Sequence, residues 1–368
     1  MNREVISDKQ GIVLLILFIS GSSVVLPTAA EAKSDLWIAI LLALVVSGIP
    51  VAIYARILYL FPTKDLFDIV EDIFGKVAGK IFVLLYTWFA FHLSVLVLRN
   101  FGDFISIVGL NGTPMIVPMA VIGILTIWGI REGIEVLGRW AEFFLPVSGV
   151  LVATAILLLI PEMDINRIRP ILYEGMGPVY RGAFSAFSFP FAETVIFLMA
   201  FDVLKRKNSA YKVYFTGLVL GGMIIWATSI TELLVLTPAT YEAVYFPAYM
   251  TVFRLNVGEF LQRMEIIVSI TFLIGGFVKI SICLLAATKG ITKLFNFTDY
   301  RFAVTPIGLL MINTAFFIYG SIMEGVEWAS KVWPYYALPF QVFLPLLIWI
   351  AAELKNYRRQ KLNRSGGH

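Results

Sequence analysis

Two short polar runs interrupt long apolar stretches of the sequence, and their residue types are suited to holding a charged ligand inside a membrane. They are Ser20, Gly21, Ser22 and Ser23, and the segment that runs from Ser188 through Phe189 and Pro190 to Glu193. Small hydroxylated residues or a proline at mid-membrane unwind a helix, which frees N–H groups on one side and carbonyls on the other. These groups bind a carboxylate and an ammonium group, respectively. The two runs therefore predict a ligand cavity, whereas either run alone is equally well explained by close helix packing.

Three ionisable side chains also fall within apolar stretches: Glu193, Lys279 and His92. A charge at mid-membrane costs about 2.5–3.5 kcal/mol on the insertion scale, so charged side chains there are expected to face the protein interior. Glu193 fits a partner for a ligand amine, a proton carrier, or a structural ion pair or helix cap. Lys279 fits a fixed cation in place of a coupling sodium ion, or an ion pair with Glu193. His92 fits a proton shuttle or, more simply, a hydrogen-bonded packing residue.

Other polar or small residues in these stretches have structural explanations. Arg99 and Asp103 stand four residues apart, the spacing at which two helical side chains satisfy each other. Gly217 and Gly221 have the spacing of a helix-packing pair. Glu232 is expected near the membrane edge, where it would be solvated.

The composition indicates which elements position these residues. The 368-residue chain is 59% hydrophobic and 15% charged, with a mean hydropathy of +0.85, whereas soluble proteins carry about 25% charged residues. Repeated apolar runs of about 18 or more residues predict an all-α polytopic membrane protein with ten transmembrane helices. The predicted spans cover residues 10–31, 36–60, 78–105, 113–131, 136–160, 182–204, 210–237, 263–290, 301–321 and 335–356.

Ten spans divide into two sets of five, residues 1–160 and 178–357, and sets of five must insert with opposite orientations. The sixth span repeats the break of the first, and the fifth and tenth both contain Phe-Leu-Pro. We therefore expect a 5+5 inverted repeat with discontinuous first and sixth spans. Most of the 29 lysines and arginines fall in loops on one side, which places both termini, including the basic tail 358–368, in the cytoplasm.

Three further segments have distinctive patterns. Residues 63–80 alternate apolar and charged side chains, which predicts an amphipathic helix lying at the membrane interface. The outer loop 238–262 is rich in tyrosine and phenylalanine, which fits either a lid over the outer vestibule or a surface for a partner. The N-terminal apolar stretch is similar to a cleavable signal peptide but is long for one, and we interpret it as the first span.

The sequence argues against several classes of function. The single cysteine, Cys283, excludes an intramolecular disulfide, and two histidines leave no His/Cys metal cluster. We find no nucleophile elbow and no phosphate-binding loop. The basic residues belong to loops rather than to a nucleic-acid patch. We therefore expect no enzyme activity, no cofactor, no metal and no nucleic acid.

A set of motifs is spread along the chain: Ile6 to Gln10, Leu26-Pro27, Asp35 to Ala39, Phe61-Pro62, Phe74 to Lys76, Ser188 to Glu193, and Pro339 to Pro345. Together they resemble the B subunits of bacterial spore germinant receptors, a branch of the amino acid–polyamine–organocation (APC) transporter superfamily, which has a LeuT-like fold. The resemblance covers nearly the whole chain. Ala192 departs from it, because many relatives are expected to have glycine there, and this alanine could narrow the unwound segment and alter ligand size.

The resemblance implies a nutrient-sensing subunit in the inner spore membrane, which binds a germinant, usually an amino acid, between the first and sixth spans. A receptor A subunit and a lipoprotein C subunit would be its partners in triggering germination. The implied ligand-binding residues are Ser20, Gly21, Ser22, Ser23, Ser188, Phe189, Pro190 and Glu193, with Tyr86 and Phe277 as cavity walls and Lys279 at an ion position. The alternative is an amino acid permease coupled to sodium, or to protons through Glu193 or His92.

Overall fold

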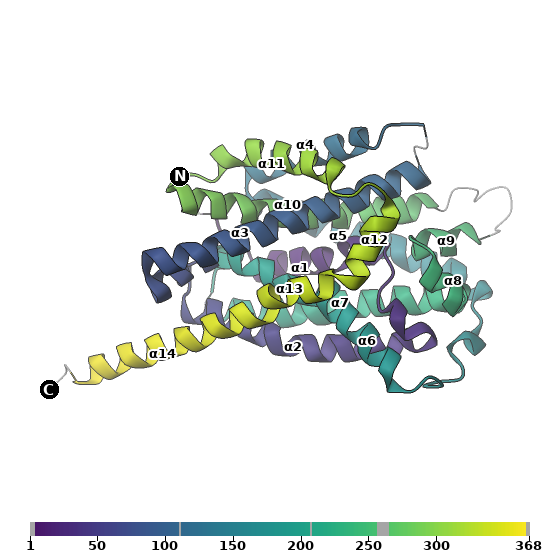
Figure 1. The fold of residues 1–368 in the computed structure, drawn as a ribbon, viewed down its shortest axis with the longest axis horizontal. Helices are drawn as coiled ribbons and strands as arrows, with labels where there is room; N and C mark the ends of the chain where they lie inside the picture. The colour runs from purple at the N-terminus through teal and green to yellow at the C-terminus, as the bar shows by residue number, and fades with distance from the viewer. Residues whose placement is uncertain (1–3, 110–111, 207, 256–264, 366–368) are drawn as a thin grey trace.

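The structure is a computed structural model that describes residues 4–109, 112–206, 208–255 and 265–365. These residues form an elongated bundle of helices (Figure 1), and no β-strand occurs among them. Both ends of the chain lie toward one end of the bundle, which we call the terminal end. The short helices α8 and α9 lie at the opposite end, which we call the lid end.

The elements follow one another along the chain with these bounds: α1 Asp8–Ser23, η1 Ala30–Asp35, α2 Leu36–Leu60, α3 Leu66–Val108, α4 Ile116–Glu132, α5 Ile134–Leu159, η2 Ile160–Glu162, η3 Ile165–Ile168, α6 Met176–Ala186, η4 Phe187–Phe191, η5 Ala192–Met199, η6 Phe201–Val203, α7 Ser209–Val235, α8 Pro238–Ala243, α9 Pro247–Phe253, α10 Glu265–Phe295, α11 Arg301–Phe317, α12 Ile322–Lys331, α13 Trp333–Leu338, η8 Pro339–Phe343 and α14 Leu344–Ser365. Because α14 continues to Ser365, the predicted tail 358–368 begins inside a helix.

Seven helices of the described chain are long and apolar enough to cross a membrane, or eight if α11 and α12, which are bent by 102°, form one span. The protein is therefore an integral membrane protein. The count of ten spans is not confirmed, since α1 and α4 have only 16 and 17 residues, and a usual span has about 20.

The predicted interfacial helix 63–80 is the first part of α3. Asp65 caps it by accepting a hydrogen bond from the Asp68 N–H at 3.0 Å. At Gly75 the backbone leaves helical geometry, with φ +82°, and then resumes the helix toward Val108. Only glycine adopts such a φ at little cost. The break thus separates an amphipathic first segment from the part of α3 that is long enough to span the membrane.

The crossing of α1 and α10 depends on two glycines. A Cβ atom on Gly275 would lie 2.6 Å from the Gly21 Cα, and one on Gly21 would lie 2.9 Å from the Gly275 carbonyl oxygen. Small residues of this kind let membrane helices approach backbone to backbone. Gly217 and Gly221 of α7 are also packing glycines, as the sequence predicted: the Leu15 and Ile19 side chains of α1 lie where their Cβ atoms would be.

Gly275→Ala is expected to destabilise the protein by about 1–3 kcal/mol, because its methyl group meets backbone that cannot rotate away. Thermal unfolding of the purified protein in lipid nanodiscs measures the effect. The neighbouring Gly276→Ala is the matched control, because a Cβ there meets only the Phe272 ring at 3.6 Å. Equal melting temperatures for the two variants would contradict a tight crossing at Gly275.

Helices α8 and α9 cover the lid end. The Tyr241 hydroxyl accepts a hydrogen bond from the Thr28 N–H at 2.9 Å and donates one to the Thr28 carbonyl at 3.2 Å. The Phe246 ring packs edge-on against Phe104 of α3, with centroids 5.1 Å apart. Of the two alternatives for the aromatic loop, its described part therefore favours a lid on the bundle. Residues 256–264 of the loop lie outside the described residues.

Two expectations for polar residues have opposite outcomes. Arg99 and Asp103 form the predicted pair, with Nε 3.0 Å from the nearer carboxylate oxygen, and Arg99 also donates to the Tyr319 carbonyl at 2.8 Å. The expectation that Glu232 is solvated is wrong, since this residue is only 6% exposed. It lies in the last turn of α7, under the cover of α9.

Candidate functional site

The predicted break of the sixth span is present. Helix α6 ends at Ala186, and Phe189 has extended backbone geometry (φ −142°, ψ 112°) inside the π-helical turn η4. The Ser188 carbonyl, which lies at this break, accepts a hydrogen bond from the Gln341 Nε2 at 2.8 Å. A carbonyl freed from the helix is thus satisfied by a side chain of η8, as buried backbone groups in a membrane protein must be. Pro190 is buried in the same turn.

The predicted break within Ser20 to Ser23 is wrong in position. These residues form the last turn of α1, and the Ser20 hydroxyl donates to the Ile16 carbonyl at 2.8 Å, as a helical serine commonly does. The helix ends at Ser23, and residues 24–29 that follow are not helical. The first span is therefore interrupted just after the polar run rather than within it.

An ion pair between Lys279 and Glu193 lies where these two interruptions meet. The Lys279 Nζ is 2.5 Å from the Glu193 Oε2, and the two side chains are 0% and 1% exposed. Ser22 accepts a hydrogen bond from Nζ at 3.3 Å. The ammonium group also faces the rings of Phe189 and Phe18, at 4.6 and 5.2 Å from their centroids. The site therefore joins α1, η4, η5 and α10 around one buried charge pair.

The Glu193 carboxylate keeps unused capacity to accept hydrogen bonds. Apart from the contact with Lys279, neither oxygen has a hydrogen-bond partner in the described chain. The buried Ser23 hydroxyl is likewise without a partner there. A carboxylate accepts about four hydrogen bonds, and leaving a buried one unsatisfied is costly. The arrangement can therefore bind a group with several N–H donors, such as an ammonium group, next to an existing cation.

The structure brings together four of the predicted site residues, Ser22, Phe189, Glu193 and Lys279, and places the others around or away from them. Gly21 of α1 lies against Gly275 of α10, which is one helical turn before Lys279. Ser20 is partly exposed and bonded within its own helix.

Three predicted residues make their contacts elsewhere. The Phe277 ring packs on Trp140 of α5 at 4.8 Å between centroids, so the prediction that it lines the same centre as Lys279 has no support in its contacts. Tyr86 donates to the Phe340 carbonyl at 3.0 Å. His92 is hydrogen-bonded to the Tyr336 hydroxyl at 3.1 Å within an aromatic cluster, which fits its packing interpretation.

Sequence reasoning missed two residues that hold the break in place, Tyr54 and Gln341. Tyr54 of α2 donates to the Gln341 carbonyl and lies 3.5 Å from the Ala192 carbonyl. Gln341 lies within the Pro339 to Pro345 motif, so the motif contained a signal, but its partner Ser188 is 153 residues away. A polar aromatic residue inside an apolar span was the only signal for Tyr54.

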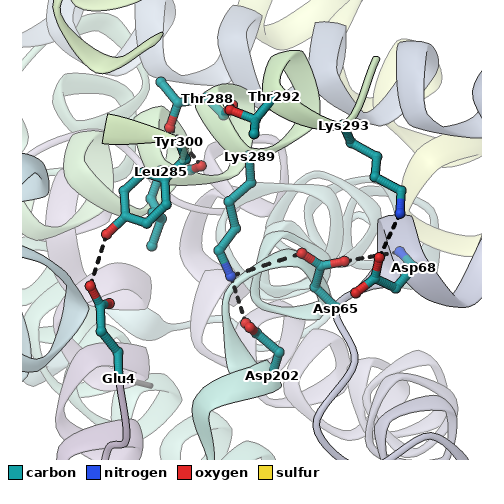
Figure 2. A network of polar contacts seen from close by, with 10 residues as sticks. All are labelled: Glu4, Asp65, Asp68, Asp202, Leu285, Thr288, Lys289, Thr292, Lys293 and Tyr300. Atoms are coloured by element: carbon teal, nitrogen blue, oxygen red, sulfur yellow. Dashed lines mark hydrogen bonds and ion pairs between the residues drawn. The ribbon is translucent and has the colours of Figure 1, made fainter. Parts of the chain in front are cut away.

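A second charged cluster lies at the terminal end (Figure 2). The Lys289 Nζ of α10 is 2.6 Å from Asp202 of η6 and 3.9 Å from Asp65 at the start of α3. One turn further along α10, Lys293 is 2.6 Å from Asp68. The cluster thus connects α10 to the first turn of α3 and to the end of the interrupted sixth span. Sequence reasoning used the two lysines only to orient the chain, and Asp65 and Asp68 only as charged positions of the predicted interfacial helix.

Asp65 makes this cluster sensitive to pH. Burial raises the pKa of its carboxyl to about 7, an effect that Lys289 opposes and that Asp202 and Asp68 increase. Because the folded protein binds this proton more tightly than the unfolded chain, the stabilisation is complete below about pH 4. It is lost progressively as the pH rises from about 4 to 7, above which the carboxyl is ionised in both states.

Between pH 6 and 8, Asp65→Asn is therefore expected to remove part of the fall in melting temperature that the wild-type protein shows as pH rises. Thermal unfolding across this range measures the slope. Asp72→Asn, at a more exposed aspartate of the same segment, is the control. An unchanged slope in Asp65→Asn would show that Asp65 does not titrate there.

The sequence is similar to a family of known proteins. Residues 5–322 match the family described as Spore germination protein. Spore germination protein KB of Bacillus subtilis is 30% identical over 365 residues, which cover 98% of each chain. Spore germination protein B2 of the same organism is 20% identical and covers 89% of each chain. The similarity thus extends over the whole bundle.

Two solved transporters have a similar fold. Mhp1, a nucleobase-cation-symport-1 family transporter in a closed conformation with bromovinylhydantoin bound, has a TM-score of 0.70 at 12% identity, covering 92% of this chain and 75% of its own. MhsT in complex with L-phenylalanine has a TM-score of 0.64 at 13% identity, covering 96% of this chain and 100% of its own. The predicted LeuT-like fold is therefore confirmed.

Proposed function

The chain belongs to the spore germination protein family, and we propose that within it the protein is the nutrient-sensing subunit of a germinant receptor. Its ligand would be a small amino acid, bound between the end of α1 and the break in the sixth span. Its relatives are germination proteins and its structural neighbours are transporters, so its role is not that of an enzyme.

The buried Lys279–Glu193 pair is the observation that carries this proposal. The ligand's ammonium group would take the free acceptor positions of Glu193, and its carboxylate would be attracted to the Lys279 ammonium. Binding would then replace one internal ion pair by two ligand contacts. A ligand that makes these contacts in only one arrangement of the helices shifts the population toward that arrangement.

The receptor's setting is part of the proposal. The membrane would be the inner spore membrane, with both termini on the core side. A receptor A subunit and a lipoprotein C subunit would read the population shift and trigger germination. The similarity to Spore germination protein B2 and Spore germination protein A2 supports the proposal that this protein works within such a group of receptor subunits.

A permease is the second candidate, and the LeuT-like fold favours it. The structural neighbour MhsT holds L-phenylalanine, and this chain covers all of that protein. In a permease, Glu193 would carry the coupling proton or Lys279 would replace a coupling sodium ion. The same buried charge pair serves both functions.

Radiolabelled amino-acid binding and uptake by the purified protein in liposomes, with and without a proton gradient, separates the two. Saturable binding without accumulation is expected for the receptor. Accumulation driven by a gradient of protons or sodium would make the permease the correct function. Absence of saturable binding for every amino acid tested would refute an amino acid as the ligand.

A further inference from the structure

Glu232 is a membrane-buried carboxylate that the proposed function does not use. It is 6% exposed, and its carboxylate makes no hydrogen bond or ion pair within the described part of the chain; only its backbone carbonyl accepts one, from the Leu236 N–H at 2.7 Å. Arg167 donates to the Leu234 carbonyl at 2.9 Å and Arg254 donates to the Val235 carbonyl at 3.2 Å, and neither forms an ion pair with Glu232. A buried carboxylate without a partner is costly, so it calls for an occupant that the chain itself does not supply.

A cavity adjoins this carboxylate at the lid end. It has a volume of about 40 Å³, which is enough for about three waters. Its wall comes from the end of α1 and from α5, α7, α9 and α10, and it includes Glu232 and four threonines. The cavity is therefore separate from the Lys279–Glu193 pair, whose residues do not line it.

Each of the four threonine hydroxyls donates its hydrogen bond to a backbone carbonyl of its own helix. Thr231, Thr251 and Thr271 each donate at 2.8 Å to a carbonyl of their own helix, and Thr228 donates at 3.1 Å. A hydroxyl that donates in this way still has a lone pair with which to accept. The polar groups of the cavity wall are consequently acceptors, arranged beside a carboxylate.

A wall of oxygen acceptors with one negative charge matches a small cation and mismatches an anion or a neutral acceptor. Hard monovalent and divalent cations take carboxylate, hydroxyl and water oxygens as ligands. One carboxylate balances one positive charge. We propose that this cavity is a binding site for a monovalent inorganic cation, with Glu232 as its charged ligand and the threonine oxygens and waters completing its shell.

The position of the site gives it a structural role. It lies where α9 of the lid meets the ends of α7 and α10. A cation held there connects the lid to the two helices, so its occupancy fixes the lid against the bundle. This role does not depend on the identity of the ligand at Lys279 and Glu193.

The test is thermal unfolding of the full-length protein in lipid nanodiscs, at constant pH and ionic strength. Chlorides of lithium, sodium, potassium and ammonium are compared with N-methyl-D-glucamine chloride. At least one inorganic cation is expected to raise the melting temperature by a few degrees in a saturable manner. Glu232→Gln is expected to abolish the rise, and Glu242→Gln, which alters an exposed carboxylate of α8, is expected to keep it.

Thr271→Val keeps the shape of the wall and removes one oxygen, and it serves if Glu232→Gln does not fold. It is expected to raise the half-saturating cation concentration at least threefold. Equal melting temperatures in all five salts would overturn the proposal, as would a saturable rise that survives Glu232→Gln. Stabilisation by acid alone, without any cation effect, would assign the cavity to a proton instead.

Discussion

Lys279→Met is expected to destabilise the protein by about 3–5 kcal/mol, because it leaves the Glu193 carboxylate buried without its counter-charge. The double variant Lys279→Met/Glu193→Gln removes both charges and is expected to recover most of this loss. Denaturation of the two variants in nanodiscs gives the coupling energy. Two neutral groups of similar size cost far less to bury than one charge.

The exposed pair Lys331–Glu327 provides the control for this cycle. Its side chains are 71% and 60% exposed, so solvent screens their attraction and the pair contributes little to stability. Lys331→Met should therefore change stability little. If Lys279→Met proved as mild as Lys331→Met, the buried pair would carry no appreciable energy, and its place at the centre of the site would have to be abandoned.

The same double variant is expected to lose the nutrient response while it remains folded. A ligand ammonium group that meets a glutamine in place of Glu193 loses a charge-assisted contact, and such contacts are about twice as strong as neutral ones. Binding should weaken at least tenfold, which corresponds to about 1.4 kcal/mol. The measurements are amino-acid binding by the purified protein and germination of spores in which the variant replaces the wild-type protein.

The Lys331→Met/Glu327→Gln double variant again serves as the control, because it removes an ion pair of the same two residue types at the surface. Spores carrying it should respond to a mixture of amino acids as the wild type does. A normal response from the Lys279→Met/Glu193→Gln spores would remove the pair from the ligand site. A lost response in both double variants would point to impaired assembly rather than to the site.

The sequence predicted best what depends on local chemistry. Pro190 cannot donate a backbone hydrogen bond, so the break of the sixth span followed from one residue type. The Ser20 to Ser23 run was ambiguous for a local reason, since a serine that donates back to its own helix tolerates helical geometry. The chain therefore remains helical through Ser23, and only the residues beyond it leave the helix.

Contacts between segments that are far apart in the sequence could not be predicted from local residue patterns. Lys279 and Glu193 were each recognised as functional candidates, but their pairing stayed one of two alternatives because they stand 86 positions apart in the sequence. The solvation of Glu232 was misjudged because its exposure depends on α9, which covers the end of α7. The cluster at Lys289 likewise depends on three segments that only the fold brings together.

Helix α10 carries both charged centres, and this gives it a mechanical property. Lys279 and Lys289 stand ten positions apart on one 31-residue helix, a rise of about 15 Å. No proline or glycine occurs between them, so this stretch has no residue at which helices commonly bend. It behaves as a stiff rod: an axial shift of the membrane-buried ammonium group moves the other ammonium group by the same amount, against Asp202 and the start of α3.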